Sequence, residues 1–288
     1  MQNSTLTNAP NFRELFKKLQ RLIVEEFKVI PTVGIEQEFY LKFNNVDEEL
    51  VVNDLSKVFD ALQKERGWHQ FEGILNFTHD LEKLADKVNA ARAQVKQKAE
   101  VLGVSANFTA KPFADDYGSA LQLNLSLHDK SQANVYSSGT IEDNQFLIHS
   151  LGGLMDIALE SVYLMCESEE DYERFKIPDF LNPTHLAWGG NNRSAVFRIP
   201  ESDPRFRRIE FRIPPAEADI DKAIFIMLLG VYHGLKNRLT PPVRIWGNAF
   251  DPIYNLVPLP LSFGDAKSVY ESGGKIGRHI EELISSHN

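Results

Sequence analysis

The sequence is poor in cysteine and in positive charge. Cys166 is the one cysteine among 288 residues, so no disulfide can form within the chain, which is typical of a reducing compartment. The formal net charge of −9 argues against nucleic acid as the main partner, because phosphate backbones bind basic surfaces. No hydrophobic segment follows Met1, and no apolar run approaches the roughly 18 residues of a membrane span. We therefore expect a cytoplasmic protein without nucleic-acid or membrane partners.

The chain alternates between helix-like and strand-like segments throughout its length. Apolar residues at helical spacing predict helices over residues 11–27, 81–102, 142–166 and 219–239, and residues 55–64 also read as a helix that ends before Gly67. Period-two or β-rich segments predict strands over residues 33–41, 68–77, 105–113, 118–129, 194–199 and 207–213. The second of these has a turn or a bulge at Glu72-Gly73. Without a repeat or a linker, we expect a single α+β domain with a largely antiparallel sheet.

The stretch "VGIEQEFYL" places two carboxylates inside a strand-like segment. Residues two apart in a strand share a face, so Glu36 and Glu38 point the same way. One interpretation is an exposed edge strand with a solvated acidic face. The other is a buried pair that needs positive charge nearby, because unpaired buried charges are costly.

Other predicted strands also carry polar side chains on one face. They include Glu72, then Gln122 with Asn124, and Glu210 between Arg208 and Arg212. Six arginines crowd into twenty residues, at positions 193, 198, 205, 207, 208 and 212, which indicates an anion site in an otherwise acidic protein. Carboxylate and amide oxygens suit Mg²⁺ that is shared with substrate phosphates. The combination favours a divalent-metal and phosphate site over a solvated sheet face.

Two arginine-rich segments carry a resemblance to a known family. "NNRSAVFRIP" and "RRIEFRIPPAEAD" resemble signatures of the glutamine synthetase catalytic domain, and "GIEQEFYL" resembles the first metal-binding strand of that family. The resemblance covers most of residues 30–240. It implies a curved sheet with helices on its outer face, formed by residues 30–288 after an arm and helix at residues 1–29. It also implies ATP and Mg²⁺ or Mn²⁺ as cofactors.

The resemblance also assigns roles to individual residues. It implies that Glu36 and Glu210 bind the metal beside the ATP phosphates, with Gln122 at a metal-ligand position, and that Glu38 and Glu72 bind the metal near glutamate. It implies catalytic arginines at Arg193, Arg198 and Arg212, nucleotide contacts at Asn124 and Arg208, and a substrate-binding arginine at Arg174. Each of these roles is an expectation taken from the family.

The sequence departs from the glutamine synthetase pattern in several places. Gln122 and Asn124 replace two histidines, although plant-type glutamate-cysteine ligases have a Gln-x-Asn strand there and a segment similar to "HQFEG". Leu181 falls near the position of the flap glutamate, unless Asp179 substitutes for it, and a third carboxylate for the glutamate-side metal is not found. About 30 residues precede the first strand, too few for the family's N-terminal β-grasp domain. We therefore expect a monomer or small homo-oligomer rather than a large ring.

Two functions follow as hypotheses from these observations. The first is an ATP-dependent carboxylate-amine ligase that activates the γ-carboxyl of glutamate, or of a similar small acid, as an acyl phosphate for attack by ammonia or another amine. The second is a catalytically silent homologue that binds nucleotide or glutamate in a regulatory role. Asp115 and Asp116 are expected to form a turn where the glutamate-binding loop of the family begins.

Overall fold

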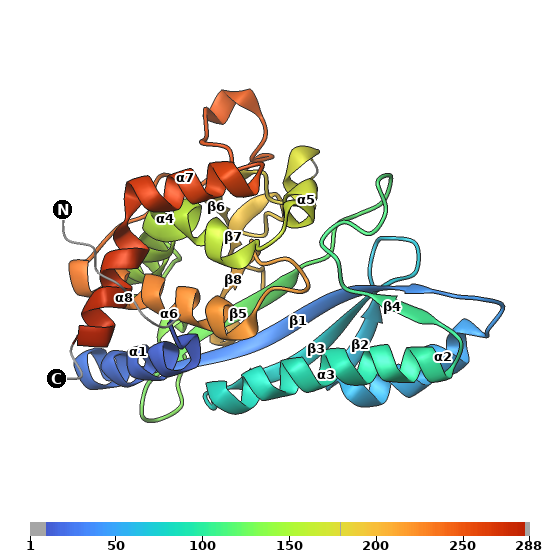
Figure 1. Ribbon diagram of the computed structural model, residues 1–288. Coiled ribbons are helices and arrows are strands. Elements are labelled where there is room, and N and C mark those ends of the chain that lie inside the picture. Colours follow the sequence, from blue (N-terminus) through green and yellow to red (C-terminus); the bar gives the residue numbers. More distant parts are fainter. Residues whose placement is uncertain (1–9, 179, 286–288) are drawn as a thin grey trace.

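The computed structural model describes residues 10–178 and 180–285 (Figure 1). Its helices are α1 (Phe12–Phe27), α2 (Glu48–Leu55), α3 (Leu81–Val101), α4 (Gln145–Met165), α5 (Glu173–Lys176), α6 (Ile220–Asn237), α7 (Phe263–Gly273) and α8 (Lys275–Ser285). Its strands are β1 (Ile30–Lys42), β2 (Ala61–Lys64), β3 (Gln70–Thr78), β4 (Ser105–Asn107), β5 (Leu121–His128), β6 (His185–Gly189), β7 (Ala195–Arg198) and β8 (Ile209–Phe211).

Polar residues at the predicted boundaries begin the long helices. The side chains of Asn11, Asp80, Asn144 and Asp219 each accept a hydrogen bond from a backbone N–H in the first turn of α1, α3, α4 and α6. Such caps satisfy donors that a helix start otherwise leaves without partners. The helix starts predicted at Asn11, Leu81 and Asp219 are therefore confirmed within a residue or two.

The strands form one sheet in the order β2-β3-β1-β5-β8-β7-β6, with β4 paired to the far end of β1. All pairs are antiparallel except β6 with β7, which confirms the prediction of a single α+β domain with a largely antiparallel sheet. The long strand β1 joins two parts of this sheet, with β2 and β3 on one side and β5 and β8 on the other (Figure 1).

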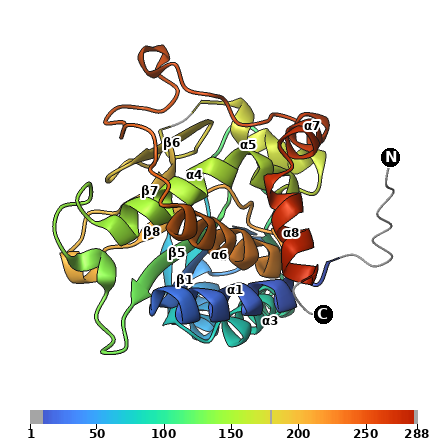
Figure 2. The ribbon, with the colours of Figure 1, turned by 90° about the vertical axis from the view of Figure 1, so that its left-hand side faces the viewer.

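Helices cover the apolar face of the sheet. In Figure 1 α3 runs along β1 and β3. In both views α1 and α6 lie beside β1 and β5 (Figures 1 and 2). The leucines of β5 alternate with polar residues, and Leu121, Leu123, Leu125 and Leu127 are completely buried in the core. The other face of the same strands is therefore left for the polar side chains.

The helices α4 and α6 pack closely through glycines. A Cβ atom on Gly153 would lie 2.0 Å from the carbonyl oxygen of Gly230, so a larger side chain would push the two helices apart. By length and composition α4 could cross a membrane, contrary to the expectation that no such segment exists, but 72% of its apolar window is buried inside the protein. It is packed as the core helix of a globular fold.

One predicted helix is wrong. Residues 55–64 divide between the end of α2, a short 3-10 turn and β2, which pairs with β3 from Ala61 to Lys64. Asp47 begins α2 earlier than predicted by accepting a hydrogen bond from the N–H of Glu49. The segment that follows pairs with β3, and this tertiary pairing overrides its local helical pattern.

The division between residues 1–29 and 30–288 stays a prediction. The helix α1 packs into the same core as α6.

Candidate functional site

The strand register sets the predicted polar residues side by side on one face of the sheet. It pairs Glu72 with Glu38, Gln122 with Glu36, and Glu210 with both Asn124 and Arg198. Residues directly opposite in neighbouring strands have Cβ atoms about 5 Å apart. The sheet thus gathers side chains that are up to 174 positions apart in the sequence.

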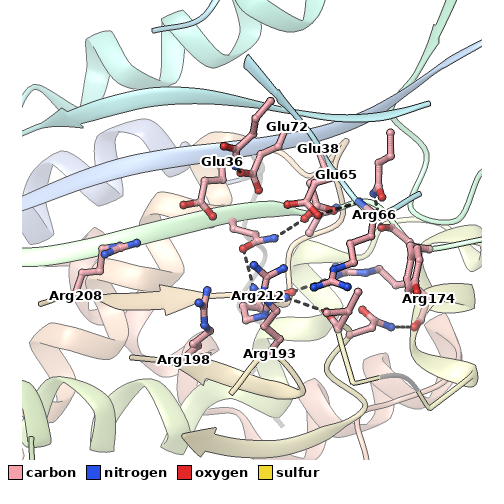
Figure 3. A pocket seen from close by; sticks show the side chains of 18 residues that line it. Glu36, Glu38, Glu65, Arg66, Glu72, Arg174, Arg193, Arg198, Arg208 and Arg212 are labelled. Atoms are coloured by element: carbon pink, nitrogen blue, oxygen red, sulfur yellow. Dashed lines mark hydrogen bonds between the residues drawn. The ribbon is translucent and has the colours of Figure 1, made fainter. Parts of the chain in front are cut away.

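A pocket of about 210 Å³ opens over this row (Figure 3). Nine of the eleven predicted site residues line it: Glu36, Glu38, Glu72, Gln122, Arg174, Arg193, Arg198, Arg208 and Arg212. The other two, Asn124 and Glu210, are buried and hold lining arginines through hydrogen bonds. The structure therefore brings the predicted set together in one place, which excludes the alternative of an exposed acidic edge.

We call Arg198, Arg208, Glu210 and Arg212, on or beside β7 and β8, the arginine half of the pocket. Glu210 has no exposed surface and accepts hydrogen bonds from Nη1 of Arg198, at 2.6 Å, and from Nη1 of Arg212. Burial alone would raise the pKa of Glu210, but these two guanidiniums outweigh it and hold the pKa below its usual value. Arg208 donates from Nε to Oδ1 of Asn124 at 2.9 Å.

We call Glu36, Glu38 and Glu72, with Glu65, the carboxylate half. Burial, followed by the charge of Glu210, raises the pKa of Glu36 to about 7. Burial, followed by the charges of Glu36 and Glu38, raises the pKa of Glu72 to about 9. The pKa of Glu38 is also raised, mainly by burial, although its Oε2 accepts a hydrogen bond from the N–H of Ala120 at 2.8 Å. The arginines near this half therefore do not offset the burial of its carboxylates.

Gln122 connects the two halves. Its Nε2 donates to Oε1 of Glu38, and its Oε1 accepts from Nη1 of Arg212 at 2.8 Å. The amide can do both because it carries a donor and an acceptor on one rigid group. Arg212 also donates from Nη2 to the carbonyl of Leu181 at 2.9 Å.

The carboxylates do not yet converge on one point. Among residues 10–178 and 180–285 no group of three or more His, Cys, Asp or Glu side chains stands ready to hold a metal ion. The predicted ligands have protein partners instead, since Glu210 pairs with two arginines and Oε1 of Glu72 accepts from Gln63 at 2.7 Å. The donor set still suits a hard divalent cation, because buried carboxylates that lack countercharge would be neutralised by one.

Two predicted arginines differ in their availability. Arg174 is buried and donates from Nη1 to the carbonyls of Ile213 and Pro214, at 2.9 and 3.1 Å. It therefore holds the chain that follows β8, and its role toward a substrate stays a prediction. Arg193 is exposed at the pocket rim and makes no ion pair within the described part of the chain.

Sequence reasoning missed several residues that line the pocket, namely Gln63, Glu65, Arg66, Gln70 and Tyr117. The first three were assigned to a helix or its end, whereas β2 carries Gln63 to the pocket and Glu65 follows it by two residues. The charge of Glu65 contributes to the raised pKa of both Glu38 and Glu72. The spacing of two between Gln63 and Glu65 could have indicated a strand with both polar side chains on one face. Leu181 lines the pocket as expected, and Asp179 lies outside the described residues.

Comparisons with known proteins agree on one family. Residues 42–275 match the family model described as "Glutamine synthetase, catalytic domain". The chain is 28% identical to gamma-glutamylputrescine synthetase PuuA of Escherichia coli, over 81% of this chain and 50% of that protein. It is 31% identical to glutamine synthetase of Helicobacter pylori, over 72% of this chain and 41% of that protein. The chain thus spans about half the length of these relatives.

Solved structures share the fold at low sequence identity. The structure described as "Apo GmaS without ligand" superposes with a TM-score of 0.79 at 21% identity, covering 93% of this chain and 69% of that chain. The structure described as "GmaS/ADP complex-Conformation 1" gives a TM-score of 0.81 at 20% identity, covering 95% and 71%. These likenesses support the fold.

Proposed function

Because the chain belongs to the family of glutamine synthetase catalytic domains, we propose that it serves an ATP-dependent carboxylate-amine ligase. In the proposed reaction, ATP phosphorylates the γ-carboxyl of glutamate or of a similar small acid. An amine then attacks the acyl phosphate, forming an amide and releasing inorganic phosphate. The observation that carries this proposal is the pocket in which a carboxylate half faces an arginine half.

The carboxylate half would hold the divalent cations. Glu36, with Gln122 and with Glu210 from the arginine half, would form one site. Glu38, Glu72 and Glu65 would form the other, and Glu65 would then supply the third carboxylate that was not found in the sequence. Bound Mg²⁺ or Mn²⁺ would neutralise phosphate oxygens and polarise them toward attack. The raised pKa values of Glu36 and Glu72 fit this role, since these groups gain most from added positive charge.

The arginine half would hold the phosphates. Arg208 would contact the nucleotide together with Asn124, while Arg193, Arg198 and Arg212 would neutralise the transferring phosphoryl group. Glu210 and Gln122 fix the guanidiniums of Arg198 and Arg212 before any ligand arrives. Preorganised cations of this kind lower the barrier without having to reorient during the reaction. Arg174 would contribute positive charge near the acid substrate.

The acceptor is a further part of the proposal. The pocket presents Leu181 and Asn182 where the family resemblance places a flap glutamate, which disfavours ammonia as the acceptor. A relative of this chain is named a gamma-glutamylputrescine synthetase, so an amine larger than ammonia is compatible with the family.

The test is release of ADP from ATP in the presence of Mg²⁺, glutamate and a panel of amines. We expect release that requires glutamate and an amine together, and we expect Glu36→Gln to reduce it at least a hundredfold. A matched control is Glu271→Gln, since Glu271 is an exposed carboxylate on α7 that does not line the pocket. Binding of ATP without ADP release under any of these conditions would instead support the catalytically silent homologue.

A further inference from the structure

A second groove adjoins the reaction pocket. It has a volume of about 1090 Å³ and lies between the loop after β2 and the loop after β4, which rise side by side in Figure 1. Glu65, Arg66 and Gln70 line both cavities. The groove and the reaction pocket therefore adjoin each other at these three residues.

Aromatic side chains form the walls of this groove. Trp68 is 75% exposed and Phe113 is 40% exposed, although both belong to the most hydrophobic residue types. Trp68 lies against His69 with ring centroids 4.3 Å apart, and Phe113 meets Tyr40 edge-on at 5.3 Å. Each ring is thus supported on one side and open to the groove on the other. Apolar faces of this kind bind flat or apolar bodies.

The two loops are fixed to each other. The N–H of Trp68 donates to Oδ2 of Asp116 at 2.7 Å, and Oδ1 of the same carboxylate accepts from the N–H of Tyr117 at 2.8 Å. Tyr40 adds a hydrogen bond from its hydroxyl to the carbonyl of Tyr117 at 2.9 Å. The groove is therefore held open by its own contacts, which lowers the cost of ordering it around a ligand.

The charge of the groove favours a cation. Its carboxylates are Glu48, Glu65, Asp115 and Asp116, against Lys64 and Arg66. Lys64 is already paired with Glu48, which also pairs with His69 at 2.8 Å. Asp115 makes no ion pair within the described part of the chain and is exposed. A protonated amine entering past Asp115 would therefore meet attraction at the mouth of the groove.

We infer that this groove binds the acceptor, and that the acceptor is a primary amine with an aromatic or similarly bulky apolar body. This inference rests on the proposed ligase function. The apolar body lies between Trp68 and Phe113, and the ammonium group points toward the border that the groove shares with the reaction pocket. The volume of the groove and its exposed rings would contribute nothing to the binding of ammonia, because ammonia has no apolar body that could contact them.

The chemistry at the end of the groove balances. The ammonium gives one proton to solvent, and its nitrogen lone pair forms the C–N bond with the γ-carbonyl carbon of the acyl phosphate. The bond from that carbon to the phosphate oxygen breaks. The second proton lost by the nitrogen leaves with inorganic phosphate, so the products are the amide, phosphate and one proton.

The experiment compares 2-phenylethylamine, 1,4-diaminobutane, methylamine and ammonia in the ADP-release assay. We expect 2-phenylethylamine to have the highest kcat/KM, and Trp68→Ala to lower that value about tenfold, mainly through KM, because stacking and apolar contact are lost. The kcat/KM for ammonia should change less than twofold in Trp68→Ala. Trp68→Phe should retain most of the kcat/KM for 2-phenylethylamine. The matched control is Trp246→Ala, which removes a tryptophan that is 76% exposed on another loop.

The outcomes separate this inference from the proposed function. If no amine, ammonia included, supports ADP release, the proposed function fails. The groove would still be supported as an amine site if 2-phenylethylamine quenches the tryptophan fluorescence of the protein and Trp68→Phe abolishes this quenching. If ADP is released but Trp68→Ala affects ammonia and 2-phenylethylamine equally, or affects neither, the groove is not the acceptor site. A preference for ammonia or for 1,4-diaminobutane in the unmodified protein would overturn the inferred class of amine.

Discussion

In the arginine half of the pocket the central buried carboxylate has cationic partners, whereas in the carboxylate half several glutamates share a region with too little positive charge. Glu210 pairs with Arg198 and Arg212, and its pKa is lowered. Glu36 and Glu72 have raised pKa values. The contrast teaches that one half offsets its buried carboxylate with its own arginines, whereas the other contains buried carboxylates whose charge the surrounding residues do not fully offset.

Removing the centre of the arginine half should have the largest effect. Glu210→Ala leaves two guanidiniums without their shared carboxylate in a buried site, so we expect a loss of about 3–5 kcal/mol in the free energy of unfolding. Urea denaturation measures this value, with Glu271→Ala as the exposed control. A loss below about 1 kcal/mol would show that the arginine half does not depend on its internal pairing.

The carboxylate half should respond to pH and metal together. The folded-state pKa values of about 7 for Glu36 and about 9 for Glu72 exceed their unfolded values, so folding favours the protonated forms. Their contribution to the stability of the metal-free protein is full below about pH 4.5 and is lost as pH rises toward 9. Mg²⁺ needs ionised carboxylates, so the increase in Tm on adding Mg²⁺ should be larger at pH 8.5 than at pH 5.5. An equal increase at both pH values would contradict a carboxylate site.

A neutral substitution in the carboxylate half should stabilise the metal-free protein, whereas one in the arginine half should destabilise it. Glu72→Gln keeps the shape and removes a buried carboxyl that resists ionisation, so we expect the metal-free protein to gain about 1–3 kcal/mol at pH 8. The same variant should lose much of the Mg²⁺-dependent increase in Tm. If Glu72→Gln destabilises the metal-free protein as strongly as Glu210→Ala does, the contrast between the halves fails.

The smallest effect should come from the residue that joins the halves. Gln122→Leu removes the hydrogen bonds to Glu38 and Arg212 while keeping a similar volume, and we expect a loss of about 1–2 kcal/mol. A double-mutant cycle with Glu72→Gln measures whether Gln122 is coupled to the carboxylate half. Strict additivity would show that Gln122 is not coupled to Glu72.

Several parts of the site could be predicted because strands alternate their side chains. Glu36 with Glu38, and Gln122 with Asn124, follow from a period of two within one segment each. The segment around Glu65 could not be predicted in the same way, because residues 55–64 have a helical local pattern and become a strand only by pairing with β3. The groove at Trp68 was missed for a different reason, because it forms where two loops that are distant in the sequence meet.

By itself the sequence determined which residues could share a face, where most of the long helices begin, and that arginines would meet carboxylates. These features depend on local periodicity and capping, which a short window of residues contains. Only the tertiary structure decided how charge is distributed between the halves. Glu210 is neutralised by arginines, whereas Glu72 is left with a raised pKa. The difference depends on burial and on neighbouring side chains from other strands, and the strand register fixes those neighbours.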